Sequence, residues 1–136
     1  MDITTKLTFL EQFPLFEALS AEEKKKLTQM VEFNRLAKHR SVYELGDKSD
    51  KIFFLVKGSI KISAQYGEER EVIKCILHPL AMFGELCIVG EDARTDLASA
   101  QNEEIHFFTL RLEDFRSLMA GNFGFSNSVL QLIGSK

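Results

Sequence analysis

The chain has 136 residues, of which 45% are hydrophobic and 27% are charged, and its formal net charge is −3. This length and composition are typical of one globular domain with a buried core, and they exclude a disordered chain. The negative charge gives no support to nucleic-acid or membrane binding by the whole surface, and no apolar run approaches the roughly 20 residues of a membrane span.

Helices are expected over about residues 1–33. A capping box marks the start of one of them, because the Ser20 side chain can accept from the amide of Glu23 while the Glu23 carboxylate reaches back to Ser20. The charged run that follows is typical of a solvated helix face. Apolar residues recur beyond it at helical spacing: Leu27, Met30 and Val31.

From about residue 34 to residue 110, short β-rich runs alternate with glycine-bearing turns. Residues 51–57 carry apolar side chains on both strand faces, which predicts a strand covered on both sides. Residues 59–77 are typical of a hairpin, with Gly67 in the turn. Many short strands at this spacing predict a β-sandwich or a β-barrel.

The C-terminal residues, about 111–136, return to a helical pattern. Gly121 is expected to end a first helix, and a second begins near Ser126. This second helix carries an apolar stripe without an obvious partner, so we expect either a chain that is truncated here or a helix that packs on another chain. The stripe consists of Val129, Leu130 and Ile133.

A segment before the last strands combines features of a phosphate site. The planar fork of Arg94 suits a phosphate, although an isolated arginine is usually a surface residue. Gly84 precedes a run that can form one helical turn, and the free amides of such a turn favour an anion. Glu85 would repel that anion, but it can accept hydrogen bonds from sugar hydroxyls beside a phosphate. A ribose phosphate satisfies both charged residues.

Apolar residues near this segment are candidates for the walls of the pocket, with ordinary core packing as the alternative for each. Residues 73, 75 and 77 are expected to share one strand face, because side chains alternate along a strand. The four wall candidates are Phe83, Leu86, Ile73 and Cys75.

From about Phe13 to the C-terminus, the chain resembles the cyclic nucleotide-binding domain found in bacterial catabolite activator proteins, cyclic-nucleotide-dependent protein kinases and gated channels. The specific part is "FGELCIVGEDARTDLASA", which is similar to the phosphate-binding cassette of that family. The glycine-punctuated strands around Gly46 and Gly58 and the helix "LRLEDFRSLMAG" extend the match. The resemblance implies a jelly-roll β-barrel flanked by helices.

The resemblance also implies roles for individual residues. Glu85 would accept the ribose 2′-hydroxyl, and Arg94 would pair with the cyclic phosphate. Thr95 would supply a hydroxyl or an amide near the phosphate or the base. Backbone amides or shape would come from Gly84, Leu86 and Cys87.

The chain departs from the family pattern at several positions. Asp96 stands where a small residue is usual, and on a strand it would share a face with Arg94 and could hold it or compete with phosphate. Leu80 and Ala81 replace a common Gly-acidic pair, and Phe123 stands where proline is frequent. The long helix that caps the base in the family, and the helix-turn-helix of its regulators, would lie beyond Lys136.

Other classes of site find little support. The histidines, His39, His78 and His106, are far apart and lack HxH or HExxH spacing, and the two cysteines form no CxxC pair. There is no GxSxG, P-loop or GxGxxG motif. We expect Cys75 and Cys87 to be small buried residues. The protein is therefore expected to be reduced and cytoplasmic, with no metal, no cofactor and no enzymatic activity.

The prediction is a single cyclic nucleotide-binding domain over residues 1–136. We expect the sensor of a bacterial transcription regulator, with cAMP favoured over cGMP as the ligand. The intact protein would dimerise through its C-terminal helix, contact DNA only through a domain outside this chain, and not bind membranes. The alternative is a degenerate domain that serves as a ligand-free protein interaction module, with Asp96 paired to Arg94.

Overall fold

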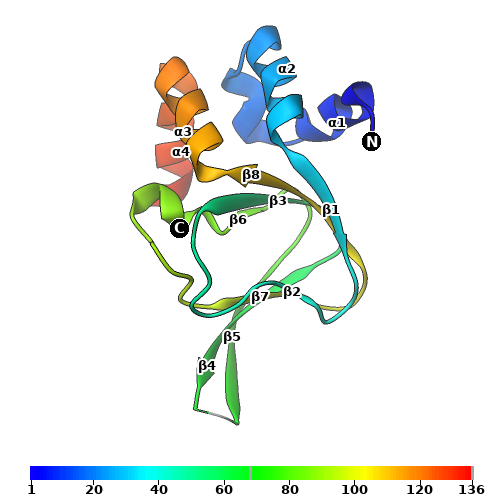
Figure 1. Cartoon of the computed structure of the whole chain (residues 1–136), viewed down its shortest axis with the longest axis vertical. Helices are drawn as coiled ribbons and strands as arrows, with labels where there is room; N and C mark the ends of the chain where they lie inside the picture. Colours follow the sequence, from blue (N-terminus) through cyan, green and yellow to red (C-terminus); the bar gives the residue numbers. More distant parts are fainter. Residues whose placement is uncertain (68, 136) are drawn as a thin grey trace. The chain divides into compact units, whose positions relative to one another are not determined.

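The computed structural model describes residues 1–67 and 69–135, which fall into two compact units (Figure 1). A helical unit is made of residues 1–32 together with residues from 110 onward, and a β unit spans residues 33–109. Two residues of the predicted elements lie outside the described residues. They are Glu68, in the predicted hairpin turn, and Lys136, at the predicted end of the last helix.

The helical unit contains the first and the last helices of the chain. The capping box is confirmed at the start of its second α-helix: the Glu23 amide donates to Ser20 Oγ at 3.1 Å, and the Ser20 amide donates to Glu23 Oε1 at 2.9 Å. The predicted helix end at Gly121 is confirmed as well. The elements are α1 (Ile3–Leu10), the 3₁₀ helix η1 (Pro14–Ala18), α2 (Ala21–Met30), α3 (Leu112–Gly121) and α4 (Phe123–Gly134).

Aromatic packing and one asparagine join the two ends of the chain in this unit. The rings of Phe16 and Phe125 stack with centroids 6.2 Å apart. Asn122 donates from its amide nitrogen to the carbonyl of Ala18 at 2.9 Å, while its oxygen caps α4 by accepting from the Phe125 amide. The expected unpartnered stripe of α4 is therefore only partly correct, because Val129 is fully buried in the unit.

The β unit consists of two four-stranded sheets, with the strand orders β1-β8-β3-β6 and β2-β7-β4-β5. The pairings of β2 with β7, β3 with β6, and β4 with both β5 and β7 are antiparallel. The first strand begins slightly earlier than expected, because α2 ends at Met30 and the chain is extended by Val31. The strands are β1 (Glu32–Leu36), β2 (Ser41–Tyr43), β3 (Lys51–Lys57), β4 (Ile60–Tyr66), β5 (Arg70–Leu77), β6 (Met82–Phe83), β7 (Leu97–Ala100) and β8 (Ile105–Arg111).

The core of the β unit lies between the two sheets, since its buried cluster takes Phe53 and Phe107 from one sheet and Ile62 and Ala98 from the other. Four consecutive residues of β3, from Ile52 to Leu55, are buried, which confirms a strand covered on both faces. Over the described residues the strands form two separate sheets in a jelly-roll-like arrangement. The predicted antiparallel β fold with helices at both ends is confirmed, and the arrangement is consistent with the predicted jelly-roll type, although the two sheets are not joined into one barrel within the described residues.

A bulge alters the edge strand of the second sheet. Ile62 pairs with Cys75, and the next residue, Ser63, pairs with Ile73, so Lys74 is the extra residue of β5. Directly paired residues lie on the same face, and therefore Ile73 and Cys75 lie on opposite faces. The expectation that they share a face is wrong, and so is the expectation that Cys75 is buried, because it is exposed on this edge strand.

Candidate functional site

The site is built on the glycine turn that leaves β6. Gly84 has a left-handed backbone conformation, with φ of +71°, and it leads directly into the 3₁₀ helix η2 (Glu85–Val89), as the sequence predicts. A β-carbon at this position would lie 2.8 Å from Cδ2 of Phe53 and 3.0 Å from Nη1 of Arg94. Glycine is therefore required both by the backbone conformation and by the close approach of two side chains.

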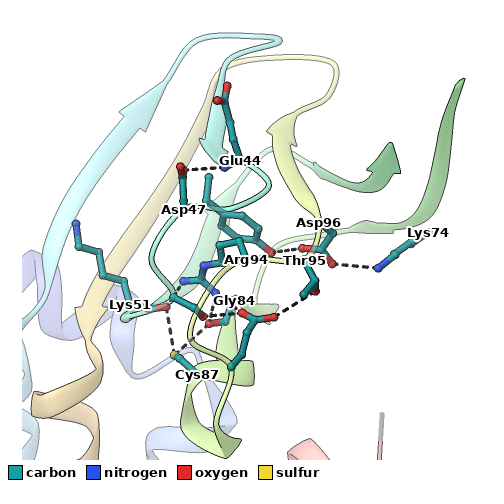
Figure 2. Close-up of polar contacts among 12 residues, drawn as sticks. Glu44, Asp47, Lys51, Lys74, Gly84, Cys87, Arg94, Thr95 and Asp96 are labelled. Atoms are coloured by element: carbon teal, nitrogen blue, oxygen red, sulfur yellow. Dashed lines mark hydrogen bonds and ion pairs between the residues drawn. The ribbon is translucent and has the colours of Figure 1, made fainter. Parts of the chain in front are cut away.

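Arg94 lies behind this turn, with only 3% of its surface exposed. Its Nη1 donates to the carbonyl of Gly84 at 2.8 Å, and its Nη2 donates to the carbonyl of Lys51 at 2.6 Å (Figure 2). The two branches of the guanidinium thus join the start of η2 to the start of β3. A buried charge persists in a fold only when such partners satisfy it.

Two aromatic rings cover the guanidinium. Its Cζ lies 4.4 Å from the ring centroid of Tyr43 and 5.5 Å from that of Phe53. These distances are typical of cation–π contacts, which are strongest where water is excluded. Among the described residues, no hydrogen-bond partner reaches the buried Nε of Arg94. This N–H is therefore a buried donor without a partner within these residues.

Glu91 is the carboxylate that accompanies Arg94, with its Oε1 3.5 Å from Nη1. The same oxygen accepts from Ser49 Oγ at 2.6 Å, and Oε2 accepts from Thr95 Oγ1 at 3.3 Å. Sequence reasoning missed Glu91 as a site residue. The signal was present, because an acidic residue three positions before the candidate phosphate-binding arginine is unexpected in an anion site.

Asp96 does not have the predicted role. It lies in the bend before β7 rather than in the strand, so the shared-face argument does not apply. It accepts from the Tyr43 hydroxyl at 3.1 Å and forms an ion pair with Lys74 at 3.5 Å (Figure 2). Burial, and then the charge of Asp96, raises the pKa of Tyr43 well above its usual range. The phenol therefore stays protonated and can donate to Asp96.

Glu85 and Cys87 are buried within η2. Glu85 directly follows the glycine whose carbonyl accepts from Arg94, so its backbone lies one residue from a group that the guanidinium binds. The thiol of Cys87 approaches the carbonyl of Gly84 at 3.5 Å, and burial raises its pKa. The expectation that Cys87 is a small buried residue is confirmed, and a raised pKa disfavours the reactive thiolate.

The remaining predicted residues differ in exposure. Phe83 is buried and stacks on Phe53 with centroids 5.2 Å apart. Leu86 and Ile73 are 45% and 53% exposed, and Thr95 is exposed but bonded to Glu91. The structure thus brings Phe83 together with the turn and Arg94. The roles of Leu86 and Ile73 as pocket walls stay predictions, as do all the ligand contacts.

Within residues 1–67 and 69–135, no group of three histidine, cysteine or acidic side chains is arranged to hold a metal ion. In the same residues, no helix has both the length and the apolar character needed to cross a membrane.

A family model described as the cyclic nucleotide-binding domain matches residues 33–122. The chain belongs to this family. The match confirms the resemblance inferred from the cassette, and it covers the β unit together with α3. The family is defined by ligand binding rather than by catalysis.

Relatives of the cyclic nucleotide-binding domain occur in proteins of different kinds. The chain is 26% identical over 114 residues to the cGMP-dependent protein kinase egl-4 of Caenorhabditis elegans, covering 83% of this chain and 15% of the kinase. It is 27% identical over 111 residues to a CRP-like cAMP-activated global transcriptional regulator of Mycobacterium tuberculosis, covering 82% of this chain and 48% of the regulator. The chain therefore spans less than half of these relatives.

Among solved structures, the sensor domain of the transcriptional regulator DNR from Pseudomonas aeruginosa has the same fold. It superimposes with a TM-score of 0.88 and 19% identity, covering 97% of this chain and 88% of the DNR chain. At this level of identity, the similarity establishes the architecture alone.

Proposed function

We propose that the chain is a sensor domain that binds a purine cyclic nucleotide, cAMP or cGMP, at a site around the Gly84–Glu85 turn and Arg94. The observation that carries the proposal is the buried Arg94 behind a glycine that has no room for a β-carbon. The carbonyls of Gly84 and Lys51 fix the buried guanidinium in place, and a donor group that is fixed in this way binds an anion more strongly.

Arg94 and Glu85 would bind different parts of the nucleotide. The cyclic phosphate would pair with the Arg94 guanidinium, whose Nη1 lies 3.5 Å from the Glu91 carboxylate. The ribose 2′-hydroxyl would donate to Glu85, because an ionised carboxylate can only accept. Leu86 and Ile73, both about half exposed, offer apolar surface that a ligand would cover.

The preference for adenine or guanine depends on residues near the base. We expect cAMP to be preferred to cGMP, while Thr95 has an exposed hydroxyl that could also serve a guanine. The relatives represent both nucleotides, since one is a cGMP-dependent kinase and another a cAMP-activated regulator.

The wider protein is proposed to be a bacterial transcription regulator. Support comes from the Mycobacterium tuberculosis regulator and from the architecture shared with the DNR sensor domain. With a formal net charge of −3, this chain would leave DNA contact to another domain. Dimerisation is proposed to use the C-terminal helix, where Phe123 and Leu130 are exposed.

One observation favours the alternative of a ligand-free interaction module. The Arg94 guanidinium already binds the carbonyls of Gly84 and Lys51 and pairs with Glu91. In this alternative, the internal partners would replace the nucleotide permanently. The partner in question is Glu91 rather than the Asp96 expected from the sequence.

Thermal denaturation with cAMP, cGMP and non-cyclic 5′-AMP separates the two functions. A ligand of the folded state at 100 times its Kd stabilises that state by about 2.7 kcal/mol. We therefore expect a clear rise in Tm with cAMP, a smaller rise with cGMP and little change with 5′-AMP. A folded protein whose Tm responds to neither cyclic nucleotide would support the interaction module instead. Isothermal titration calorimetry then gives the Kd values.

A further inference from the structure

The environment of Glu91 is that of a bound anion. Its carboxylate accepts from Ser49 Oγ at 2.6 Å and from Thr95 Oγ1 at 3.3 Å, and it lies 3.5 Å from Nη1 of Arg94. Its side chain is only 13% exposed. Two hydroxyls and a guanidinium around a desolvated negative charge form the kind of donor set that proteins use to hold phosphate.

The donors come from two separate parts of the β unit. Ser49 lies just before β3, whereas Arg94 and Thr95 lie just before β7. The backbone keeps them together, because the Ser49 amide donates to the carbonyl of Asp92 at 2.9 Å and the Arg94 amide donates to that of Asp47 at 2.7 Å. The donor set is therefore held by main-chain bonds that do not involve the Glu91 carboxylate.

The backbone at Glu91 is also fixed, since its amide donates to the carbonyl of Leu86 at 3.1 Å. The carboxylate can thus leave its three partners by side-chain rotation alone, with η2 and the turn at Gly90 in place. Rotations of this kind are rapid on the timescale of ligand binding.

We propose that the Glu91 carboxylate is an internal anion that occupies the phosphate position of the nucleotide site and thereby weakens the binding of the nucleotide. The inference rests on the proposed function and names the residue that sets affinity at that site. The phosphate must displace Glu91 from Arg94, Ser49 and Thr95, and like charges cannot share such a small, covered space without a large energetic cost.

The test compares two variants that change the net charge equally. Glu91→Gln keeps the shape of the side chain and removes the charge, while Asp92→Asn makes the same change at the next residue, which is exposed. By titration calorimetry with cAMP, we expect the Kd to fall by roughly tenfold or more for Glu91→Gln. Asp92→Asn is expected to stay within about twofold of wild type. Equal or weaker binding by Glu91→Gln would overturn the proposal.

A second arm does not depend on nucleotide binding, so it separates failure of this inference from failure of the proposed function. Sulfate is an anion of suitable size and is added at increasing concentration while Tm is recorded. Its general stabilising effect is common to all three proteins. If sulfate binds where the Glu91 carboxylate lies in the wild type, sulfate should raise the Tm of Glu91→Gln more than that of the wild type or of Asp92→Asn. This excess measures sulfate binding at that position. The same rise in all three proteins would overturn the proposal, whether or not the wild type binds cAMP.

If Glu91→Gln does not fold, Glu91→Asp decides between the outcomes. This variant keeps the charge but withdraws it by one methylene, so the carboxylate can no longer reach all three donors. Tighter binding of cAMP, or a larger sulfate effect, than in wild type supports the internal anion. Values equal to those of wild type contradict it.

Discussion

Arg94 holds together three parts of the β unit that are distant in sequence. Its branches bind the carbonyls of Gly84 and Lys51, the latter 43 residues earlier in the chain, and its face lies against Tyr43. Lysine could not reproduce this arrangement, because it offers a point charge on a flexible stem rather than a planar fork. The arginine therefore has a structural role in the β unit in addition to being the candidate phosphate-binding residue.

Removing this side chain should affect both binding and stability. For Arg94→Ala, we expect the affinity for cAMP to fall at least tenfold, because losing a charge-assisted pair in a covered site costs about 2–5 kcal/mol. We also expect a lower Tm, since two carbonyls lose a donor and Glu91 loses its ionic partner. Calorimetry and thermal denaturation measure the two effects. An unchanged Kd for cAMP in the folded variant would refute the role of Arg94 in the ligand site.

At this scale the residue types and their spacing selected Gly84, Glu85 and Arg94 as candidate ligand contacts, which stay predictions. They did not predict that Arg94 is buried or which groups surround it. The groups around the arginine come from distant parts of the chain. The Tyr43 ring and the Lys51 carbonyl contact it directly, and Ser49 donates to its ionic partner Glu91. No local pattern marks these residues. Asp96 was assigned to the wrong partner because β7 begins one residue after it, which leaves the carboxylate free to accept from the Tyr43 hydroxyl.

Among the elements, those specified by local signals were predicted well. The capping box starts α2, Gly121 ends α3, and the turn after Gly84 becomes η2. The bulge in β5 was not predicted, because it arises from the pairing with β4 rather than from the sequence of β5 itself. The strict alternation assumed for Ile73 and Cys75 failed for that reason.

The turn between β6 and η2 offers a matched test of backbone conformation against space. Gly84 and Gly67 have nearly the same φ, +71° and +76°, but a β-carbon at Gly67 would meet nothing within 4 Å. Gly67→Ala should therefore cost only backbone strain, about 1–2 kcal/mol. Gly84→Ala should cost clearly more, because its β-carbon would displace Phe53 or Arg94.

Urea denaturation of both glycine variants gives the difference in unfolding free energy, and calorimetry with cAMP shows whether the displaced Arg94 also affects binding. Equal destabilisation by the two substitutions would mean that the turn can relax away from Phe53 and Arg94. The close approach at Gly84 would then not constrain the site.

For the molecule as a whole, the sequence predicted helices at both ends and strands between them, and the structure agrees. It did not predict that the two helical ends share one compact unit. The bond from Asn122 to the carbonyl of Ala18 spans 104 residues, and the stacked rings of Phe16 and Phe125 accompany it. Contacts at this sequence separation depend on the path of the intervening chain and leave no periodic signal.

Two phenylalanines of α4 test how much this unit contributes to stability. Phe125 is fully buried against Phe16 and Phe115, whereas Phe123, two residues earlier, is 86% exposed. We expect Phe125→Ala to lower the unfolding free energy by about 3–5 kcal/mol, as is usual for a buried aromatic residue. Phe123→Ala should change it by no more than about 0.5 kcal/mol. Urea denaturation monitored by circular dichroism measures both, and similar values would contradict the packing described for α4.

The bulge at Lys74 also affects whether copies of the protein can associate through the edge of the sheet. β5 is the last strand of its sheet, and it exposes Val72 and Ile73 along an open edge. Such edges invite the addition of a strand from a neighbouring molecule, which needs a straight row of unpaired backbone groups. The extra residue bends that row, and the charges of Arg70, Glu71 and Lys74 lie along it. The strand thus exposes apolar side chains and yet remains a poor template for aggregation.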